Sequence, residues 1–226
     1  MISFVGKKIL ISRADSDLGQ KLSIKLDNLG AKLVLIGENE KKLKETISLL
    51  RNNKQIYHYY KFNDIEKINE LISILVSYDN IKFDGYIHCE ANSIHYDNCY
   101  EDFEIFFKKD AYFYTSMINY LSQDEYSNNN MSILFLTTNL RKNVLERNLL
   151  GMANHYAISN LSKILSVKYM HRQVRVNSVL SDFNQVNLND KNYLNNYLEK
   201  TSNVVIYLMS ESAKYIIGEE YVVDNY

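Results

Sequence analysis

The chain has 226 residues, a formal net charge of −1 and 46% hydrophobic residues, which suits one globular domain with an ordinary core. The near-neutral charge gives no electrostatic footprint for nucleic acid or an anionic membrane. No apolar run reaches the roughly 18 residues that cross a bilayer, and no signal-peptide pattern is present at the N-terminus. Two cysteines, Cys89 and Cys99, are too few for a disulfide framework. We therefore expect a cytoplasmic protein that binds neither nucleic acid nor membrane.

Strand-like and helix-like patterns alternate along the whole chain. In chain order, the first half predicts a strand at 8–11, a helix at 18–29 ended by Gly30, a strand at 32–36, a helix at 39–52, a strand at 56–62, a helix at 65–78 and a strand at 85–88. The second half predicts a helix at 103–121, a strand at 132–136, a helix at 152–170, a strand at 174–179, a helix at 201–209 and a last strand at 220–223.

The predicted strands are apolar without alternation, which is typical of a parallel sheet covered on both faces. Right-handed crossovers between such strands lead to a Rossmann-type, doubly wound α/β/α arrangement of three layers. No linker, internal repeat or low-complexity tract divides the sequence. We therefore expect a single α/β domain that spans residues 1–226.

Several segments resemble the framework of the short-chain dehydrogenase/reductase family, in order and at family-like spacing. Residues 6–12 (GKKILIS) and 30–35 (GAKLVL) resemble its first two strands, and residues 161–169 (LSKILSVKY) and 174–179 (VRVNSV) its dimer helix and sixth strand. Residues 215–218 (YIIG) and 222–224 (VVD) match its closing turn and strand. The resemblance implies a Rossmann domain related to NAD(P)-dependent oxidoreductases. It also implies a homo-oligomer, or a hetero-oligomer with another member, through the helices near 103–121 and 152–170.

The cofactor turn departs from the family pattern. The family's Thr-Gly-x-x-x-Gly-x-Gly corresponds here to residues 12–19 (SRADSDLG), so Arg13 and Asp17 replace two of the three glycines. Those glycines let the backbone turn tightly and approach a pyrophosphate at a helix N-terminus, where the Asp17 carboxylate would repel phosphate. The resemblance assigns the cofactor-binding positions to Ser12, Asp17, Leu18, Gly19 and Glu38. We expect no ordinary cofactor, with NAD(P) left open by the resemblance.

Other nucleotide positions of the family are also replaced. Glu38 follows the second predicted strand, where its carboxylate would accept hydrogen bonds from a ribose diol and repel a 2′-phosphate. The family's Asn-Asn-Ala-Gly segment corresponds to residues 88–91 (HCEA). The histidines and cysteines lack paired spacings such as Cys-x-x-Cys, so we predict no metal site.

The catalytic positions follow from the register set by residues 175–177 (RVN). Counted back from that segment, the family's Ser-Tyr-Lys set falls on Thr138, Gly151 and His155, with Thr138 thirteen residues before Gly151. The family's mechanism needs a Tyr hydroxyl to transfer the proton and a Lys that lowers the pKa of that hydroxyl. Gly151 has no proton to transfer. Tyr156 lies one residue beyond His155, which turns a helical side chain by about 100°.

Two hypotheses about function follow from this pattern. The first is a pseudoenzyme, a structural or regulatory subunit that pairs with itself or with an active family member. The alternative is a divergent NAD(P)-dependent oxidoreductase that acts on a carbonyl, hydroxyl or acyl-carrier substrate and uses Thr138, His155 or Tyr156 in an altered arrangement.

Overall fold

A computed structural model describes residues 2–51, 56–59, 67–77, 82–89, 112–138, 149–181 and 191–223. Its seven strands form one sheet in the order β3-β2-β1-β4-β5-β6-β7, and every pair of neighbours is parallel. The strands are β1 (Lys8–Ser12), β2 (Lys32–Gly37), β3 (Ile56–Tyr59), β4 (Phe83–Cys89), β5 (Ser127–Thr138), β6 (Arg175–Ser181) and β7 (Glu220–Val223). This is the doubly wound order, which reverses between β1 and β4.

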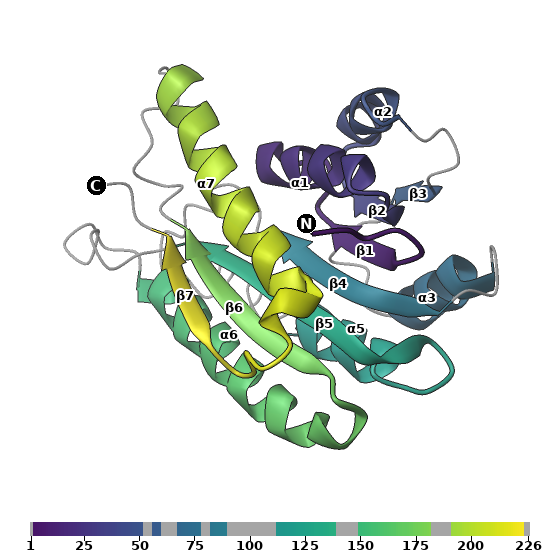
Figure 1. Ribbon diagram of the computed structural model, residues 1–226, viewed down its shortest axis with the longest axis vertical. Helices are drawn as coiled ribbons and strands as arrows, with labels where there is room; N and C mark the ends of the chain where they lie inside the picture. The colour runs from purple at the N-terminus through teal and green to yellow at the C-terminus, as the bar shows by residue number, and fades with distance from the viewer. Residues whose placement is uncertain are drawn as a thin grey trace.

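Helices cover both faces of the sheet (Figure 1). One face carries α1 (Asp17–Asn28), α2 (Glu40–Ser48) and α7 (Lys191–Met209), and the other carries α3 (Ile68–Ser77), α5 (Phe113–Leu121) and α6 (Leu149–Lys168). Successive strand residues enter opposite cores, since Ile9 and Ile11 pack with α1 whereas Leu10 packs with α3 and α5. The predicted three-layer α/β/α Rossmann arrangement is confirmed.

Two predicted boundaries differ most from the structure. We expected a helix only over 201–209, but α7 begins at Lys191, because Tyr197 and Leu198 are buried one helical turn before Thr201 and continue the same face. Strand β5 begins at Ser127 rather than at residue 132, since Ser127 pairs with Phe83 of β4 before a shift in register, and the polar residues 127–130 carry no apolar signal. Of the helix predicted over 103–121, residues 113–121 form α5 and residues 103–111 lie outside the described residues.

The predicted stop of the first helix is confirmed. Gly30 follows α1 with φ +91°, a left-handed conformation that costs a glycine little. Its N–H donates to the carbonyl of Asp27 at 3.0 Å, so a carbonyl of the last helical turn is satisfied by a backbone hydrogen bond. Within the described part of the chain, no helix is long and apolar enough to cross a membrane.

The Arg-Val-Asn segment that set the sequence register begins β6. Arg175 is buried, and its guanidinium donates to the carbonyls of Leu208, Ser210 and Ala213 at 2.9, 3.3 and 3.0 Å. The side-chain amide of Asn177 donates to a carbonyl and accepts an N–H within residues 216–219. Both side chains therefore satisfy backbone groups of the segment that joins α7 to β7.

Candidate functional site

The turn at 12–19 lies at the carboxyl-terminal edge of the sheet, where the strand order reverses between β1 and β4. Ser12 ends β1 and pairs in register with His88 near the end of β4. Crevices at such a switch point are where open α/β sheets bind ligands. The sheet therefore places the predicted cofactor turn where a Rossmann fold uses one.

Arg13 occupies the position of the family's first glycine in a left-handed conformation, with φ +56°. That conformation costs a residue with a Cβ roughly 1–2 kcal/mol. The side chain is buried, and its Nη1 lies 3.7 Å from Oε2 of Glu38 at the end of β2. The turn thus keeps a backbone that suits glycine, and the arginine places a buried cation beside Glu38.

Gly19 allows α1 to approach the turn closely. A Cβ at this position would lie 2.3 Å from the carbonyl oxygen of Arg13, so a side chain does not fit there. Leu18 is buried in the core that α1 shares with the sheet. Gly19 and Leu18 therefore act in helix–sheet packing.

The N-terminus of α1 is capped by its own side chains. Ser16 is the N-cap, and its Oγ accepts the N–H of Gly19 at 3.0 Å and donates to the carbonyl of Arg13 at 2.8 Å. Asp17 is exposed in the first turn, where its carboxylate is favoured by the helix dipole. These groups occupy the place where a pyrophosphate would meet free N–H groups and positive potential.

Asp15 organises the same edge, and sequence reasoning missed it. Its Oδ2 accepts the backbone N–H of Glu38 at 3.0 Å and of Asn39 at 2.7 Å. A Cβ on Gly37 would lie 2.7 Å from its carboxyl group, so the side chain lies tightly against the end of β2. The available signal was a short acidic side chain in a turn next to a second strand that ends in glycine.

A buried polar cluster lies beneath the turn. Nδ1 of His88 is 2.7 Å from Oγ of Ser12 and 3.0 Å from the hydroxyl of Tyr86, and the His88 ring packs against Tyr114. Burial, followed by the charge of Arg13, lowers the pKa of His88, so its ring is neutral. Burial raises the pKa of the Tyr86 hydroxyl, with a smaller opposing effect from Ser12. With His88 neutral, both hydroxyls are able to donate to Nδ1.

Two residues named in the sequence analysis, Ser12 and Cys89, are buried at this edge of the sheet. Ser12 turns its hydroxyl into the interior rather than toward the crevice. Cys89 is buried, and burial raises the pKa of its thiol, so it is held protonated. Among the described residues no group of three His, Cys, Asp or Glu side chains is placed to hold a metal ion.

The residues predicted to occupy the family's catalytic positions lie on two elements. Thr138 is the last residue of β5 and pairs with Ser181 of β6. Gly151 and His155 lie in the first half of α6, and the side chains of Thr138 and His155 lie outside what the structure describes. Tyr156 follows on the same helix with 55% of its surface exposed. Cys99 and His95, which belong to the histidines and cysteines considered as metal ligands, lie outside the described residues, and so does Glu90.

Known proteins resemble the chain over almost its full length. It is 26% identical to the 3-oxoacyl-[acyl-carrier-protein] reductase FabG of Rickettsia felis, covering 97% of this chain and 95% of that protein. It is 28% identical to the reductase of the same name from Rickettsia typhi, over 84% of this chain and 78% of that protein. No protein-family model matches the chain.

Solved structures share its fold. A short-chain dehydrogenase/reductase from Mycobacterium ulcerans superposes with a TM-score of 0.81 at 15% identity, covering 99% of this chain and 90% of that one. A variant of a short-chain dehydrogenase/reductase from Serratia marcescens gives a TM-score of 0.83 at 14% identity, covering 98% and 97%. The chain therefore shares the fold of short-chain dehydrogenase/reductases, and its sheet order and framework segments resemble that family.

Proposed function

We propose that the protein is a divergent oxidoreductase that transfers hydride between a nicotinamide dinucleotide and a carbonyl or hydroxyl group. The observation that carries the proposal is the end-to-end similarity to 3-oxoacyl-[acyl-carrier-protein] reductases, on a sheet whose strand order reverses between β1 and β4. Since those relatives act on acyl-carrier substrates by name, a 3-oxoacyl thioester is the first substrate to test.

The ribose end of a dinucleotide fits the residues at the crevice. Glu38 follows β2 and stands 19 residues after Gly19 (38 − 19), close to the spacing at which Rossmann folds place an acidic residue on the ribose hydroxyls. Its carboxylate would repel a 2′-phosphate, which favours NAD over NADP. Arg13, 3.7 Å away, supplies a cation on the same side of the turn.

The phosphate end does not fit in the usual way. Ser16 already holds the N–H of Gly19, and the Asp17 carboxylate lies on the first turn of α1. A pyrophosphate there would displace the cap and face a negative charge. We therefore expect weak binding, and we derive no catalytic step through the cofactor.

Acid–base chemistry would fall to Thr138 with His155 or Tyr156. A Thr hydroxyl donates a hydrogen bond to a carbonyl oxygen, and an imidazole titrates near neutral pH. Thr138 ends β5 at the edge that carries the crevice. Gly151 stands in the family's Tyr position, so the proton must come from another group.

A second candidate is a non-catalytic partner subunit. It is favoured by Arg13 and Asp17 in the phosphate turn and by Gly151 in the catalytic position. On this hypothesis the protein contributes its fold and its helices to an assembly, with no turnover of its own.

The exposed face of α6 supports pairing with a second copy of the chain. Tyr156, Ile164 and Val167 recur at helical spacing with 55%, 63% and 68% of their surfaces exposed. Such a stripe on a soluble protein is typical of a surface that another protein covers. Replacing Ile164 and Val167 by lysine is expected to convert a dimer into a monomer in sedimentation equilibrium. A wild-type protein that sediments as a monomer at high concentration would remove this proposal.

The test of the oxidoreductase proposal is NADH oxidation with a 3-oxoacyl thioester, compared among wild type, Thr138→Ala, His155→Ala and Tyr156→Phe. Loss of a general acid is expected to lower turnover roughly 100-fold, so one of the last two variants identifies the acid. If wild type shows no turnover although NADH raises its melting temperature, the protein binds the nucleotide without this chemistry. That result would favour the partner-subunit function.

A further inference from the structure

A cavity of about 380 Å³ opens at the amino-terminal edge of the sheet, the opposite edge from the cofactor turn. It lies between the start of β6 and the segment after α7, and the residues that decide its chemistry are Asn130, Met170, Gln173, Arg175, Lys214 and Tyr215. Its volume is within the range of about 300–1,000 Å³ that is typical of small-molecule sites. Neither the proposed oxidoreductase chemistry nor the framework accounts for it.

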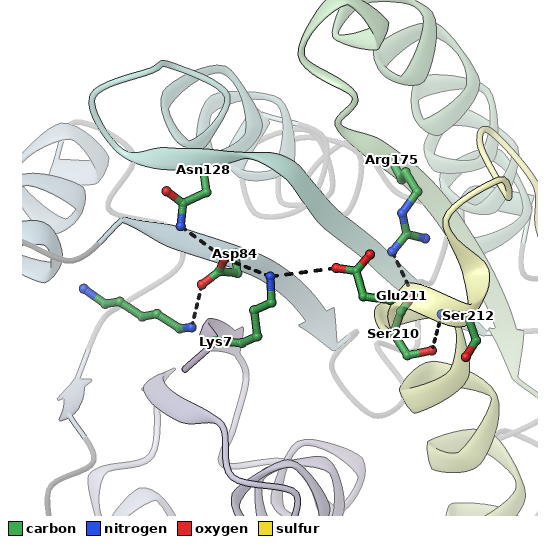
Figure 2. Close-up of polar contacts among 8 residues, drawn as sticks. Lys7, Asp84, Asn128, Arg175, Ser210, Glu211 and Ser212 are labelled. Atoms are coloured by element: carbon green, nitrogen blue, oxygen red, sulfur yellow. Dashed lines mark hydrogen bonds and ion pairs between the residues drawn. The ribbon is translucent and has the colours of Figure 1, made fainter. Parts of the chain in front are cut away.

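The inner end of the cavity carries a buried cation. Arg175 is 6% exposed, and its guanidinium donates to three neutral carbonyls, which hold it in place without cancelling its charge. The carboxylate of Glu211 also interacts electrostatically with this guanidinium. Glu211, the carboxylate of the lining, extends toward Lys7, whose Nζ is 3.8 Å from its Oε1 (Figure 2). Lys214 adds a second cation to the lining. With two cations against one carboxylate, the cavity favours an anion.

The position of Lys7 supports this charge balance. Figure 2 shows Lys7 between Asp84 and Glu211. The Nζ of Lys7 lies 3.4 Å from Oδ1 of Asp84. Asp84 is also held by the backbone N–H of Lys8 at 2.9 Å and by the amide of Asn128 at 3.1 Å. Lys7 thus pairs with both Asp84 and Glu211, and these ion pairs lie beside the cavity.

The walls of the cavity are apolar and partly aromatic. Tyr215 is 85% exposed, and the Nζ of Lys214 lies 4.9 Å from the centroid of its ring. Met170 is 54% exposed on the other side of the lining. An exposed aromatic ring and an adaptable thioether suit a planar apolar group.

Two left-handed residues shape the same cavity. Asn130 has φ +66° and Gln173 φ +58°, and they are two of the three non-glycine residues with positive φ in the described part of the chain. Left-handed backbone is uncommon outside glycine and is found disproportionately at ligand sites. Each residue brings a side-chain amide, which can both donate and accept hydrogen bonds.

We propose that this cavity binds a small amphipathic anion. Its acidic group would lie near Arg175 and Lys214, and its planar apolar body would lie against Tyr215 and Met170. The site is separate from the dinucleotide crevice, since β6 begins at this edge of the sheet whereas β1 ends at the other.

The test is isothermal titration with 2-naphthoate and with its neutral counterpart 2-naphthamide. We expect saturable one-to-one binding of naphthoate and at least tenfold weaker binding of naphthamide, about the effect of one lost charge contact in a partly buried site. Lys214→Gln is expected to weaken naphthoate about fivefold, and Tyr215→Ala about tenfold. Both side chains are exposed, so these variants should fold normally.

Lys41→Gln is the matched control, because it removes one positive charge from an exposed position of α2 on the other side of the molecule. Its affinity for naphthoate should equal that of wild type. Equal binding of naphthoate and naphthamide, no saturation at millimolar concentration, or equal losses in Lys41→Gln and Lys214→Gln would each overturn the proposal.

Discussion

The two edges of the sheet use polar side chains in different ways. At the amino-terminal edge, Arg175 and Asn177 satisfy backbone groups of the segment that closes the fold. At the carboxyl-terminal edge, Asp15 and Ser16 accept hydrogen bonds from backbone N–H groups at the start of α1 and just after β2. The first edge carries residues that resemble the family, and the second carries residues that differ from it. Hydrogen bonds within the chain thus stabilise the framework at the amino-terminal edge. At the carboxyl-terminal edge they use backbone N–H groups beside the turn that corresponds to the family's cofactor turn.

The largest expected effect comes from breaking the amino-terminal edge. Arg175→Met removes the hydrogen bonds to three carbonyls and leaves buried acceptors without these donors. We expect the free energy of unfolding to fall by about 3 kcal/mol, measured by urea denaturation. Lys41→Gln, on an exposed helix surface, should change it by no more than about 0.5 kcal/mol. A loss for Arg175→Met as small as that of the control would show that the edge does not depend on this guanidinium.

A smaller effect separates strain from side-chain loss at the carboxyl-terminal edge. Arg13→Gly and Arg13→Ala both remove the guanidinium near Glu38, but only glycine adopts φ +56° without cost. We expect Arg13→Gly to be more stable than Arg13→Ala by about 1 kcal/mol in thermal or chemical unfolding. Equal stabilities would mean that the turn relaxes once the arginine is gone.

The smallest effect concerns the contact between α1 and α7. Helix α1 begins at the carboxyl-terminal edge of the sheet, and α7 ends at the amino-terminal edge. Glu199 of α7 pairs with Lys25 and, at 2.9 Å, with Lys21 of α1, and these hydrogen bonds lower its pKa. The stability they contribute is therefore present above the unfolded carboxyl pKa of about 4.3 and is lost as pH falls through the lower folded value. Glu199→Gln should cost about 0.5 kcal/mol at pH 7 and less below pH 4. A cost that does not change between these conditions would contradict the ion-pair account.

Most of the fold could be predicted because buried parallel strands and amphipathic helices have strong periodic signals. Leu18, Leu22 and Leu26 show this, since their spacing predicts the buried face of α1. The start of α7 was missed because residues 191–196 are rich in Asn and mostly exposed, so the buried face of the helix becomes continuous only from Tyr197.

The site could be predicted only in part. The replaced glycines of the cofactor turn were visible in the sequence, and the structure shows Arg13 in the backbone conformation that a glycine would adopt. The contacts of Asp15 with Glu38 and Asn39 join residues 23 and 24 positions apart, so local spacing does not reveal them. The cavity beside Arg175 depends on three segments that come together only in the folded chain.

Titration calorimetry with NADH and NADPH tests the central proposal, that the chain binds a dinucleotide at the turn over residues 12–19 although that turn lacks two of the family's glycines. The account predicts weak binding of NADH, weaker binding of NADPH because of Glu38, and tighter NADH binding when Arg13→Gly and Asp17→Gly restore the glycines. The absence of binding heat for either nucleotide, in both wild type and the double variant, would contradict it.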